Sequence, residues 1–261
     1  GKPLGAQQYF ARLSQRLING LTALTAEGLL YEVDMRLRPS GTKGPIASTL
    51  EGFIQYHSSA AWTWEQMALT RARVLLGPKE LHRRLGEAIR DVLSVARDPE
   101  GLLRDVADMR QRLDTEHGST SLWALKNLRG GIVDIEFIAQ YLTLRHGHGH
   151  PEILGLDTRD TLAALMDAGL LDRDSGARLI DASGLWQGLQ GLLALTIEGE
   201  ITEERVEEIP GALKEDLVRV GGAADFAALE DRIRATAEAV YAIFKDIIED
   251  PASESEKKKT P

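Results

Sequence analysis

The sequence predicts a mainly α-helical protein in which a short segment of mixed helix and strand precedes a long helical-bundle domain. Apolar residues recur at spacings of three and four through most of the chain after Ser48, as on the buried face of a helix. A strict alternation of apolar and polar residues, which is typical of a β-strand, occurs only at residues 31–38. Because one strand cannot form a sheet alone, we expect its partners to lie upstream of Gly1 or in another chain.

The composition excludes several classes of protein. The chain has 261 residues, 43% of them hydrophobic and 27% charged, as expected for one large globular domain or two modest ones. It has no cysteine, so disulfides, cysteine-ligated metals and thiol nucleophiles are excluded. The net charge of −9 argues against nucleic-acid binding, and no apolar run is long enough to cross a membrane. We expect a cytoplasmic protein, and the start at Gly1 rather than methionine indicates a piece of a longer one.

The first 45 residues predict one helix and one strand. The helix, at residues 6–25, carries an apolar stripe and ends at Gly28; the stripe consists of Phe10, Leu13, Leu17, Leu21 and Leu24. In the strand at residues 29–38, positions 31, 33, 35 and 37 form an apolar face. The other face is charged and consists of Glu32, Asp34, Arg36 and Arg38. A loop rich in proline and glycine ends the strand at residues 39–45.

Helical patterns fill the remainder of the chain. Ser48 or Thr49 caps a helix that includes Phe53 and Tyr56. Further helices are predicted at residues 60–76, 79–96, 99–117, 132–146, 158–168, 175–196, 212–220 and 223–250. The polar residues at the C-terminus predict disorder. The expected domains are therefore residues 1–58, a helical bundle at residues 59–250 and a disordered tail at residues 251–261.

Two carboxylates and two guanidinium groups share the polar face of the strand. Glu32 and Asp34 offer the oxygen ligands that Mg²⁺ prefers, and the side chains of Arg36 and Arg38 match phosphate oxygens. A solvated face with ion pairs between strands explains the same pattern, and a two-metal site needs more carboxylates than this strand supplies. The residues alone leave both interpretations open.

A glycine turn precedes the helix predicted at residues 132–146. Lys126 and Arg129 bring positive charge to it, and Gly130 and Gly131 would let an anion approach the N–H groups at the start of the helix. A tight turn between two helices is the alternative interpretation. Asp134, just inside the helix, is expected to cap and pack it, as is Glu136.

Three further groups of residues are candidates for a function. We expect Trp62 and Trp64 to pack in a core or a domain interface rather than to stack on a base. Arg71 and Arg73 suit a carboxylate such as that of Glu65 or a phosphate equally well. Histidines at positions 146, 148 and 150 alternate with glycine, a pattern that rarely builds a closed zinc site, so we expect none there.

Three segments together resemble the glutamine synthetase adenylyltransferase family. They are residues 30–41 with Tyr-Glu-Val-Asp at 31–34, residues 61–73 with Trp-Thr-Trp-Glu at 62–65, and residues 128–137 with Arg-Gly-Gly at 129–131. They occur in the family's order and approximate spacing. Family members have two related halves, each joining a nucleotidyltransferase domain to a helical domain. One half attaches AMP to a tyrosine of glutamine synthetase, and the other removes it by phosphorolysis.

The resemblance implies that the chain comes from the C-terminal, AMP-attaching half. Residues 1–58 would then be the C-terminal remnant, a helix plus a strand, of an α/β nucleotidyltransferase domain, followed by the helical bundle. The implied cofactor is Mg²⁺, the implied substrate is ATP, and the implied protein partners are glutamine synthetase and the PII signalling protein. A related uridylyltransferase-type enzyme fits less well, because its hydrolase and ligand-sensing modules are not visible.

The resemblance also implies roles for individual residues. Asp34 matches the third carboxylate of the metal site, with Glu32 as a further ligand, and Arg36 and Arg38 would steady phosphates. The turn that contains Lys126, Arg129, Gly130 and Gly131 would face the nucleotide. The family's Asp-x-Asp metal pair is not found here, so the isolated chain is expected to be inactive. The alternative is a regulatory module that binds glutamine synthetase or PII.

Overall fold

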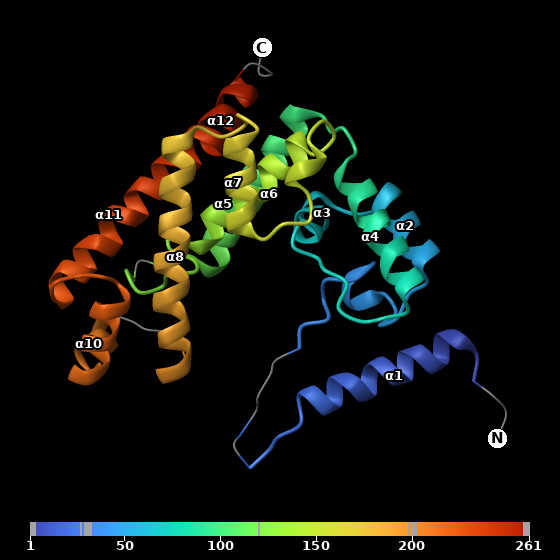
Figure 1. Cartoon of the computed structure of the whole chain (residues 1–261), viewed down its shortest axis with the longest axis horizontal. Helices are drawn as coiled ribbons and strands as arrows, with labels where there is room; N and C mark the ends of the chain where they lie inside the picture. Colours follow the sequence, from blue (N-terminus) through green and yellow to red (C-terminus); the bar gives the residue numbers. More distant parts are fainter. Residues whose placement is uncertain are drawn as a thin grey trace. The chain divides into compact units, whose positions relative to one another are not determined.

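The computed structural model describes residues 4–26, 28, 33–119, 121–197, 199 and 203–257. Its chain divides into two compact units, one of residues 1–69 and 73–92 and the other of residues 70–72 and 93–261. The boundary expected near residue 58 therefore lies inside the first unit. Helices dominate both units, as expected for a mainly α fold (Figure 1). No helix in the described ranges is long and apolar enough to cross a membrane.

The first unit contains four α-helices among its described residues: α1 (Ala6–Leu21), α2 (Leu50–Ser59), α3 (Thr63–Leu69) and α4 (Lys79–Leu93), with a 3₁₀ turn at Gly41–Lys43. Thr49 caps α2, because its hydroxyl accepts the N–H of Gly52 at 3.0 Å. Helix α3 is shorter than the predicted range of residues 60–76. It begins at Thr63 because the carboxylate of Glu65 accepts the N–H of Trp62 at 2.9 Å, an interaction that fixes the N-terminus.

Helix α1 forms where its periodicity predicts it, yet none of its residues is buried. The apolar stripe stays in contact with solvent, and Phe10, Leu13 and Leu17 are 52%, 49% and 61% exposed. Helical hydrogen bonds are internal to the helix, so α1 keeps its backbone structure without a partner for its apolar face.

The predicted strand is not formed in the described part of its range. Residues 33–36 have no regular secondary structure, residues 37–38 form a bend, and residues 29–32 lie outside the described residues. The physical reason is the lack of a neighbouring strand: among the described residues the one β-bridge is the isolated pair of Thr25 and Gly28. The backbone turns on itself instead, and the N–H of Arg38 bonds the carbonyl of Arg36 at 2.9 Å.

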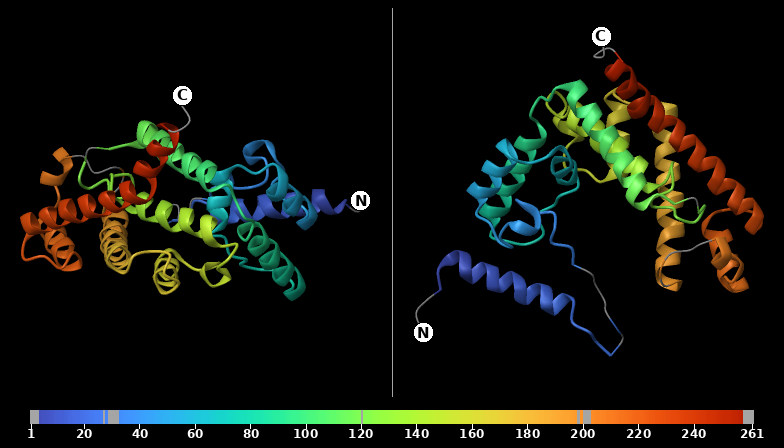
Figure 2. Two further views of the ribbon diagram at one scale, coloured as in Figure 1. Left: turned by 90° about the horizontal axis from the view of Figure 1, so that it is seen from above. Right: turned by 180° about the vertical axis from the view of Figure 1, so that it is seen from behind.

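The second unit is a helical bundle. Its longer helices are α5 (Pro99–His117), α6 (Ile132–His146), α7 (Thr158–Asp167), α8 (Arg173–Thr196), α10 (Gly211–Val220) and α11 (Phe226–Phe244), and shorter pieces are Pro151–Ile153 and α9 (Glu203–Glu207) (Figure 2). The bounds of α5 and α6 agree with the sequence prediction. Aspartates cap four of these helices by accepting the N–H of the residue three positions on: Asp98, Asp157, Asp172 and Asp225.

Helix α6 is the centre of this bundle. It packs against α5, α7, α8 and α11, and its residues from Phe137 to Leu144 are all buried. Helix α8 adds Trp186, whose side chain has no exposed surface. An apolar helix enclosed on most sides is the expected core of a helical bundle.

The C-terminal segment differs from its prediction in two ways. One helix was expected at residues 223–250, but α11 ends at Phe244 and a π-helical turn at Lys245–Glu249 leads into α12 (Asp250–Lys257). Residues 251–257 of the expected disordered tail are therefore helical, while residues 258–261 lie outside the described residues. The cause is tertiary packing: α12 lies against α5, and Ala252 is buried.

The exposure of α1 predicts that its apolar side chains contribute little to the free energy of unfolding. Replacing both Leu13 and Leu17 by Gln should change the free energy of unfolding by less than about 1 kcal/mol, because exposed positions contribute little. Leu179→Ala in α8, where the side chain has no exposed surface, should cost about 2–5 kcal/mol. Urea unfolding followed by circular dichroism measures both, and a large loss from the α1 double variant would contradict its exposed position.

Candidate functional site

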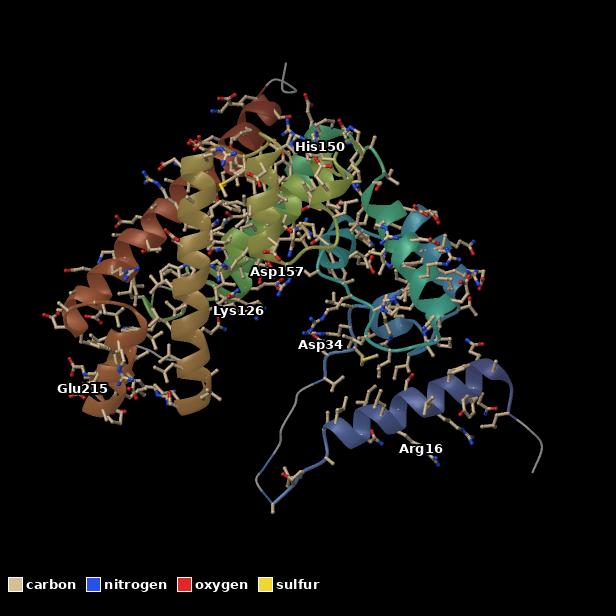
Figure 3. All side chains as sticks on the ribbon, in the orientation of Figure 1. Arg16, Asp34, Lys126, His150, Asp157 and Glu215 are labelled. Atoms are coloured by element: carbon tan, nitrogen blue, oxygen red, sulfur yellow. The ribbon has the colours of Figure 1, made fainter. Side chains whose placement is uncertain are left out.

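Asp34, one of the two residues predicted to hold a metal ion, lies on the irregular segment after α1, where Figure 3 labels it. Asp34 and Arg36 form an exposed ion pair, with Arg36 Nη2 at 2.7 Å from Asp34 Oδ2. The backbone N–H of Arg36 also donates to Asp34 Oδ1 at 2.8 Å. These hydrogen bonds from Arg36 lower the pKa of Asp34 from its ordinary value of 3.8 to about 2. Asp34 is therefore an anion at every physiological pH.

The side chain of Arg38 is used locally. Its Nη1 donates to the carbonyl of Met35, and its Nε donates to the carbonyl of Gly44 at 3.3 Å. It therefore closes the loop that follows the expected strand. Arg36 and Arg38 differ in this respect, since Arg36 faces a carboxylate and Arg38 faces backbone.

The described residues do not assemble a magnesium site by themselves. In the described part of the chain, no three carboxylate or histidine side chains converge as metal ligands. The carboxylate of Asp34 is occupied by Arg36, and Glu32 lies outside the described residues. One carboxylate is a fitting ligand for Mg²⁺ but does not make a centre.

The backbone of the glycine turn before α6 forms an internal network. The N–H groups of Gly131, Ile132 and Val133 donate to carbonyls at 2.8, 3.0 and 3.2 Å. The N–H of Gly130 donates to the carboxylate of Asp134 at 2.5 Å. Since these donors are already used, the turn offers no ready cradle for an anion, and the geometry favours the alternative of a tight turn between helices.

The two glycines are required by close packing. Gly130 has φ +83°, and a Cβ added there would lie 1.8 Å from the carbonyl oxygen of Ala237 on α11. A Cβ on Gly131 would lie 2.4 Å from the carbonyl oxygen of Leu125. The turn therefore needs glycine because another backbone passes against it, independently of any ligand.

Arg129 is held by side chains of the same unit. Its guanidinium lies 2.8 Å from Glu249 Oε1 on the π-helical turn and 3.2 Å from Asp114 Oδ2 on α5. It also lies over the ring of Tyr241, 5.5 Å from the centroid. Arg129 thus links α5 and the C-terminal helices to the turn, and its charge is already neutralised.

Beneath the turn lies the most deeply buried ion pair of the described residues. Arg110 on α5 and Asp134 on α6 are 2% and 0% exposed, and Arg110 Nε donates to Asp134 Oδ1. Arg110 Nη2 reaches the carbonyl of Asn127 at 3.3 Å. Burial raises the pKa of Asp134 despite the opposing attraction of Arg110. The pair fixes the distance between α5 and the start of α6.

The sequence analysis missed Arg110. A signal was present, since Leu102, Leu103 and Val106 precede Arg110 on the buried face of α5, and a charged side chain at such a position needs a buried partner. Asp134 was expected to cap and pack α6, and it does bond the turn, but its partner could not be identified from spacing. Glu249 was missed because its position depends on the π-helical turn.

A second buried carboxylate lies in the first unit. The hydroxyl of Tyr56 donates to Glu65 Oε1 and Oε2 at 2.8 and 2.9 Å, which joins α2 to α3. His57 is 7% exposed, and its Nδ1 has no partner in the part of the chain that the structure describes. Burial lowers the pKa of His57, so this imidazole is neutral. The cluster supports the junction of the two helices.

The predicted tryptophans, arginines and histidines lie in three different environments. Trp62 and Trp64 are 71% and 40% exposed, so neither packs in the core of the described residues. Arg71 forms an ion pair of 2.5 Å with Glu136 on α6, which fits the carboxylate interpretation of that arginine. Of the alternating histidines, His150 bonds Glu152 at 2.8 Å.

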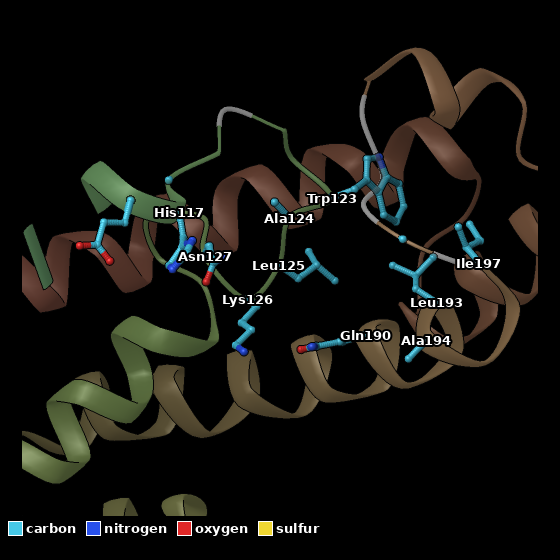
Figure 4. Close-up of a pocket in the computed structure, with 13 residues that line it drawn as sticks. His117, Trp123, Ala124, Leu125, Lys126, Asn127, Gln190, Leu193, Ala194 and Ile197 are labelled. Carbon is cyan, nitrogen blue, oxygen red and sulfur yellow. The ribbon is translucent and has the colours of Figure 1, made fainter. Parts of the chain in front are cut away.

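The side chains of Lys126 and Arg129 have different surroundings. The side chain of Lys126 is exposed and lines a pocket of about 510 Å³ between the end of α5, residues 123–127 and α8 (Figure 4). The four residues predicted together from 126 to 131 therefore divide into one that faces a pocket and three that build a turn.

The buried ion pair predicts a pH dependence. Arg110→Met should lower the free energy of unfolding by about 3–5 kcal/mol, because it leaves Asp134 buried and unpaired. In this variant the pKa of Asp134 in the folded state should rise further above its unfolded value. The folded state then binds the extra proton, so the loss should be largest at pH 8 and shrink as the pH falls to 5.

The exposed pair of Arg219 and Asp216 provides the matched control. Arg219→Met should change the free energy of unfolding by no more than about 1 kcal/mol at any pH. Urea titrations of both variants at several pH values make the comparison. Equal losses in the two variants would show that the Arg110 pair is not buried in solution.

The ion pair of Asp34 and Arg36 predicts a low pKa of the Asp34 carboxyl group, which a titration can measure. In a ¹³C NMR titration, the carboxylate of Asp34 should remain ionised until the pH falls to about 2. In Arg36→Met, the pKa should return towards 3.8, because the hydrogen-bond donors are gone. If Asp34 titrates near 3.8 in the unaltered chain, the ion pair does not persist in solution.

Comparison with known proteins agrees with the division of the chain. Residues 1–88 match the family model described as glutamate-ammonia ligase adenylyltransferase. Residues 102–248, more than half of the chain, match the model described as GlnD PII-uridylyltransferase. The two matches fall on either side of the structural boundary near residue 92.

Two curated relatives share the printed name bifunctional glutamine synthetase adenylyltransferase/adenylyl-removing enzyme. The relative from Bradyrhizobium diazoefficiens is 43% identical over 254 residues, which are 97% of this chain and 25% of the relative. The one from Xanthobacter autotrophicus is 42% identical over 251 residues, 96% of this chain and 25% of the relative. The chain thus spans about a quarter of the length of these curated relatives. By these matches, the chain belongs to the glutamine synthetase adenylyltransferase family, and residues 102–248 of its second unit also match the PII-uridylyltransferase model.

Proposed function

We propose that the chain is part of a cytoplasmic enzyme that transfers AMP from ATP to a tyrosine of glutamine synthetase, and that it comes from the AMP-attaching, C-terminal half. The observation that carries the proposal is the 43% identity over 97% of the chain to a relative with this printed activity. The motifs at residues 31–34 and 62–65 support the choice of half, because they have the form of the attaching half.

In this proposal Asp34 is one carboxylate ligand of Mg²⁺, with Glu32 beside it in the chain. Asp34 is charged at neutral pH, as a metal ligand must be, and the metal would replace Arg36 as its partner. The described residues supply no complete metal centre, and in this proposal the remaining ligands come from other parts of the whole enzyme. The metal would supply electrostatic stabilisation of the phosphates when bound.

The proposed roles of the basic residues differ. Arg36 is exposed beside Asp34 and is available to bind phosphate once Asp34 finds another partner. Arg38 braces its own loop, while Arg129, Gly130 and Gly131 build the turn before α6. We therefore propose that Arg38, Arg129, Gly130 and Gly131 hold their loop and turn in place. Arg36 and Lys126 remain the candidate ligand-binding side chains.

The second candidate is an interaction module. The match of residues 102–248 to the PII-uridylyltransferase model favours it, because that region forms its own compact unit without a metal cluster among its described residues. Such a module would bind glutamine synthetase or the PII protein. In the whole enzyme the two proposals are compatible, and they differ in what this chain does alone.

The isolated chain should not transfer AMP. Incubation with Mg-ATP carrying a labelled α-phosphate and unmodified glutamine synthetase should give no more label than a reaction without the chain, because a complete metal centre is missing from its described residues. Co-sedimentation of the same mixture tests binding to glutamine synthetase. Robust labelling would contradict the proposed inactivity, and binding without labelling would favour the interaction module.

In the whole enzyme, Asp34→Asn should lower AMP attachment by at least about a hundredfold, as expected for a metal ligand whose charge is removed. The substitution keeps the size of an exposed side chain, so the fold should be unchanged. Asp91→Asn, at another exposed aspartate, is the control and should keep full activity. Near-normal AMP attachment in the Asp34 variant would remove this residue from the metal site.

A further inference from the structure

The pocket lined by Lys126 has two chemically different ends (Figure 4). The side chains with polar ends lie on the left and in the centre of the picture: His117, Asn127 and Lys126 on the left, and Gln190 in the centre. The apolar side chains lie on the right: Trp123, Leu193, Ala194 and Ile197. All of them belong to the second unit, so the pocket does not depend on the placement of the first. Its volume of about 510 Å³ is within the range of small-molecule sites.

The polar end offers groups that are not used elsewhere. The side chains of Lys126, Asn127 and Gln190 make no hydrogen bond or ion pair with any residue that the structure describes. Arg129, three residues along, is by contrast fully engaged by Glu249 and Asp114. An unpaired ammonium group beside two amides is suited to hold one anionic group.

The charge of the pocket limits which anion fits. Among the lining residues that the structure describes, Lys126 is the one fixed positive charge, and Glu116 adds a carboxylate. Glu116 repels any anion, but the single charge of Lys126 can match one carboxylate, whereas a polyphosphate would need further cations and would be repelled more strongly. The apolar end, with Leu193 and Ile197, then favours a compact hydrocarbon body.

We propose that this pocket binds a small organic monoanion, a carboxylate with a compact apolar body, whose anionic group contacts Lys126. The inference goes beyond the proposed AMP transfer, since it gives Lys126 a ligand other than the nucleotide and places that ligand in the helical unit, whereas Asp34 belongs to the first unit. Failure of its test would leave the proposed activity untouched.

The test uses 3-phenylpropionate as the probe and 3-phenylpropanol as its uncharged counterpart. The whole 261-residue chain is labelled with 5-fluorotryptophan, and ¹⁹F NMR separates its four tryptophans, of which Trp123 lines the pocket. 3-Phenylpropionate should shift the Trp123 signal with a dissociation constant on the order of millimolar. Trp62 and Trp64 lie in the other unit and should not respond.

Two variants separate charge from shape. Lys126→Met should weaken binding of 3-phenylpropionate by about tenfold and leave binding of the alcohol unchanged. Ala194→Phe, at an exposed position that lines the apolar end, should abolish binding of both. Lys245→Met removes another exposed lysine of the same unit and should change nothing.

Three results would overturn the inference. The first is a response of Trp62 or Trp64 without one of Trp123, which would place the probe on the exposed apolar surface of the first unit. The second is an equal affinity of Lys126→Met and the unaltered chain. The third is a stronger, Lys126-dependent response of Trp123 to ATP, which would make the pocket a nucleotide site.

Discussion

The helical unit depends on one buried ion pair, between Arg110 of α5 and Asp134 of α6. Removing two charges from water is costly, and the cost is offset only because both ends have further partners. Asp134 accepts the N–H of Gly130 at 2.5 Å, and Arg110 reaches the carbonyl of Asn127 at 3.3 Å. The carbonyl of Gly130 in turn accepts the indole N–H of Trp186 at 3.2 Å, which brings in α8. One interaction thus sets the positions of three helices and the turn between two of them.

This constraint determines which residues are left for function. Gly130 and Gly131 are required because other backbone segments pass too close for a side chain, that of α11 in the case of Gly130. Arg129 is engaged in an ion pair with Glu249, which stabilises the outer side of the turn. A sequence motif with two cations and two glycines resembles an anion site, yet most of its groups are consumed by the fold. Lys126 stands at the outer edge of the network, and its charge is the one that remains available.

Elements whose signals are local were predicted well, and those that depend on distant partners were not. The bounds of α5 and α6 follow from an Asp cap, glycine and apolar periodicity, all of which lie within the segment. The π-helical turn and α12 depend on packing against α5, so residues 251–257 look like a tail in the sequence. For the site, the basic residues were recognised by type, but their partners Asp114 and Glu249 are distant in the chain, and spacing carries no information about them.

In the first unit the same distinction between local and distant partners applies to backbone hydrogen bonds. Helix α1 and the segment at residues 33–38 both have a sequence pattern that is typical of an element packed against a neighbour. In α1 the pattern is an apolar stripe, and in residues 33–38 it is an alternation of apolar and polar residues. The helix persists because its hydrogen bonds join residues of the same segment, and only its side chains lack burial. The strand does not, because its hydrogen bonds must come from another strand, and its N–H groups bond locally instead. The ion pair of Asp34 and Arg36 is one result of this local rearrangement. An added strand partner would therefore change the surroundings of Asp34 more than those of α1, because it would supply the hydrogen bonds that the segment at residues 33–38 now makes locally.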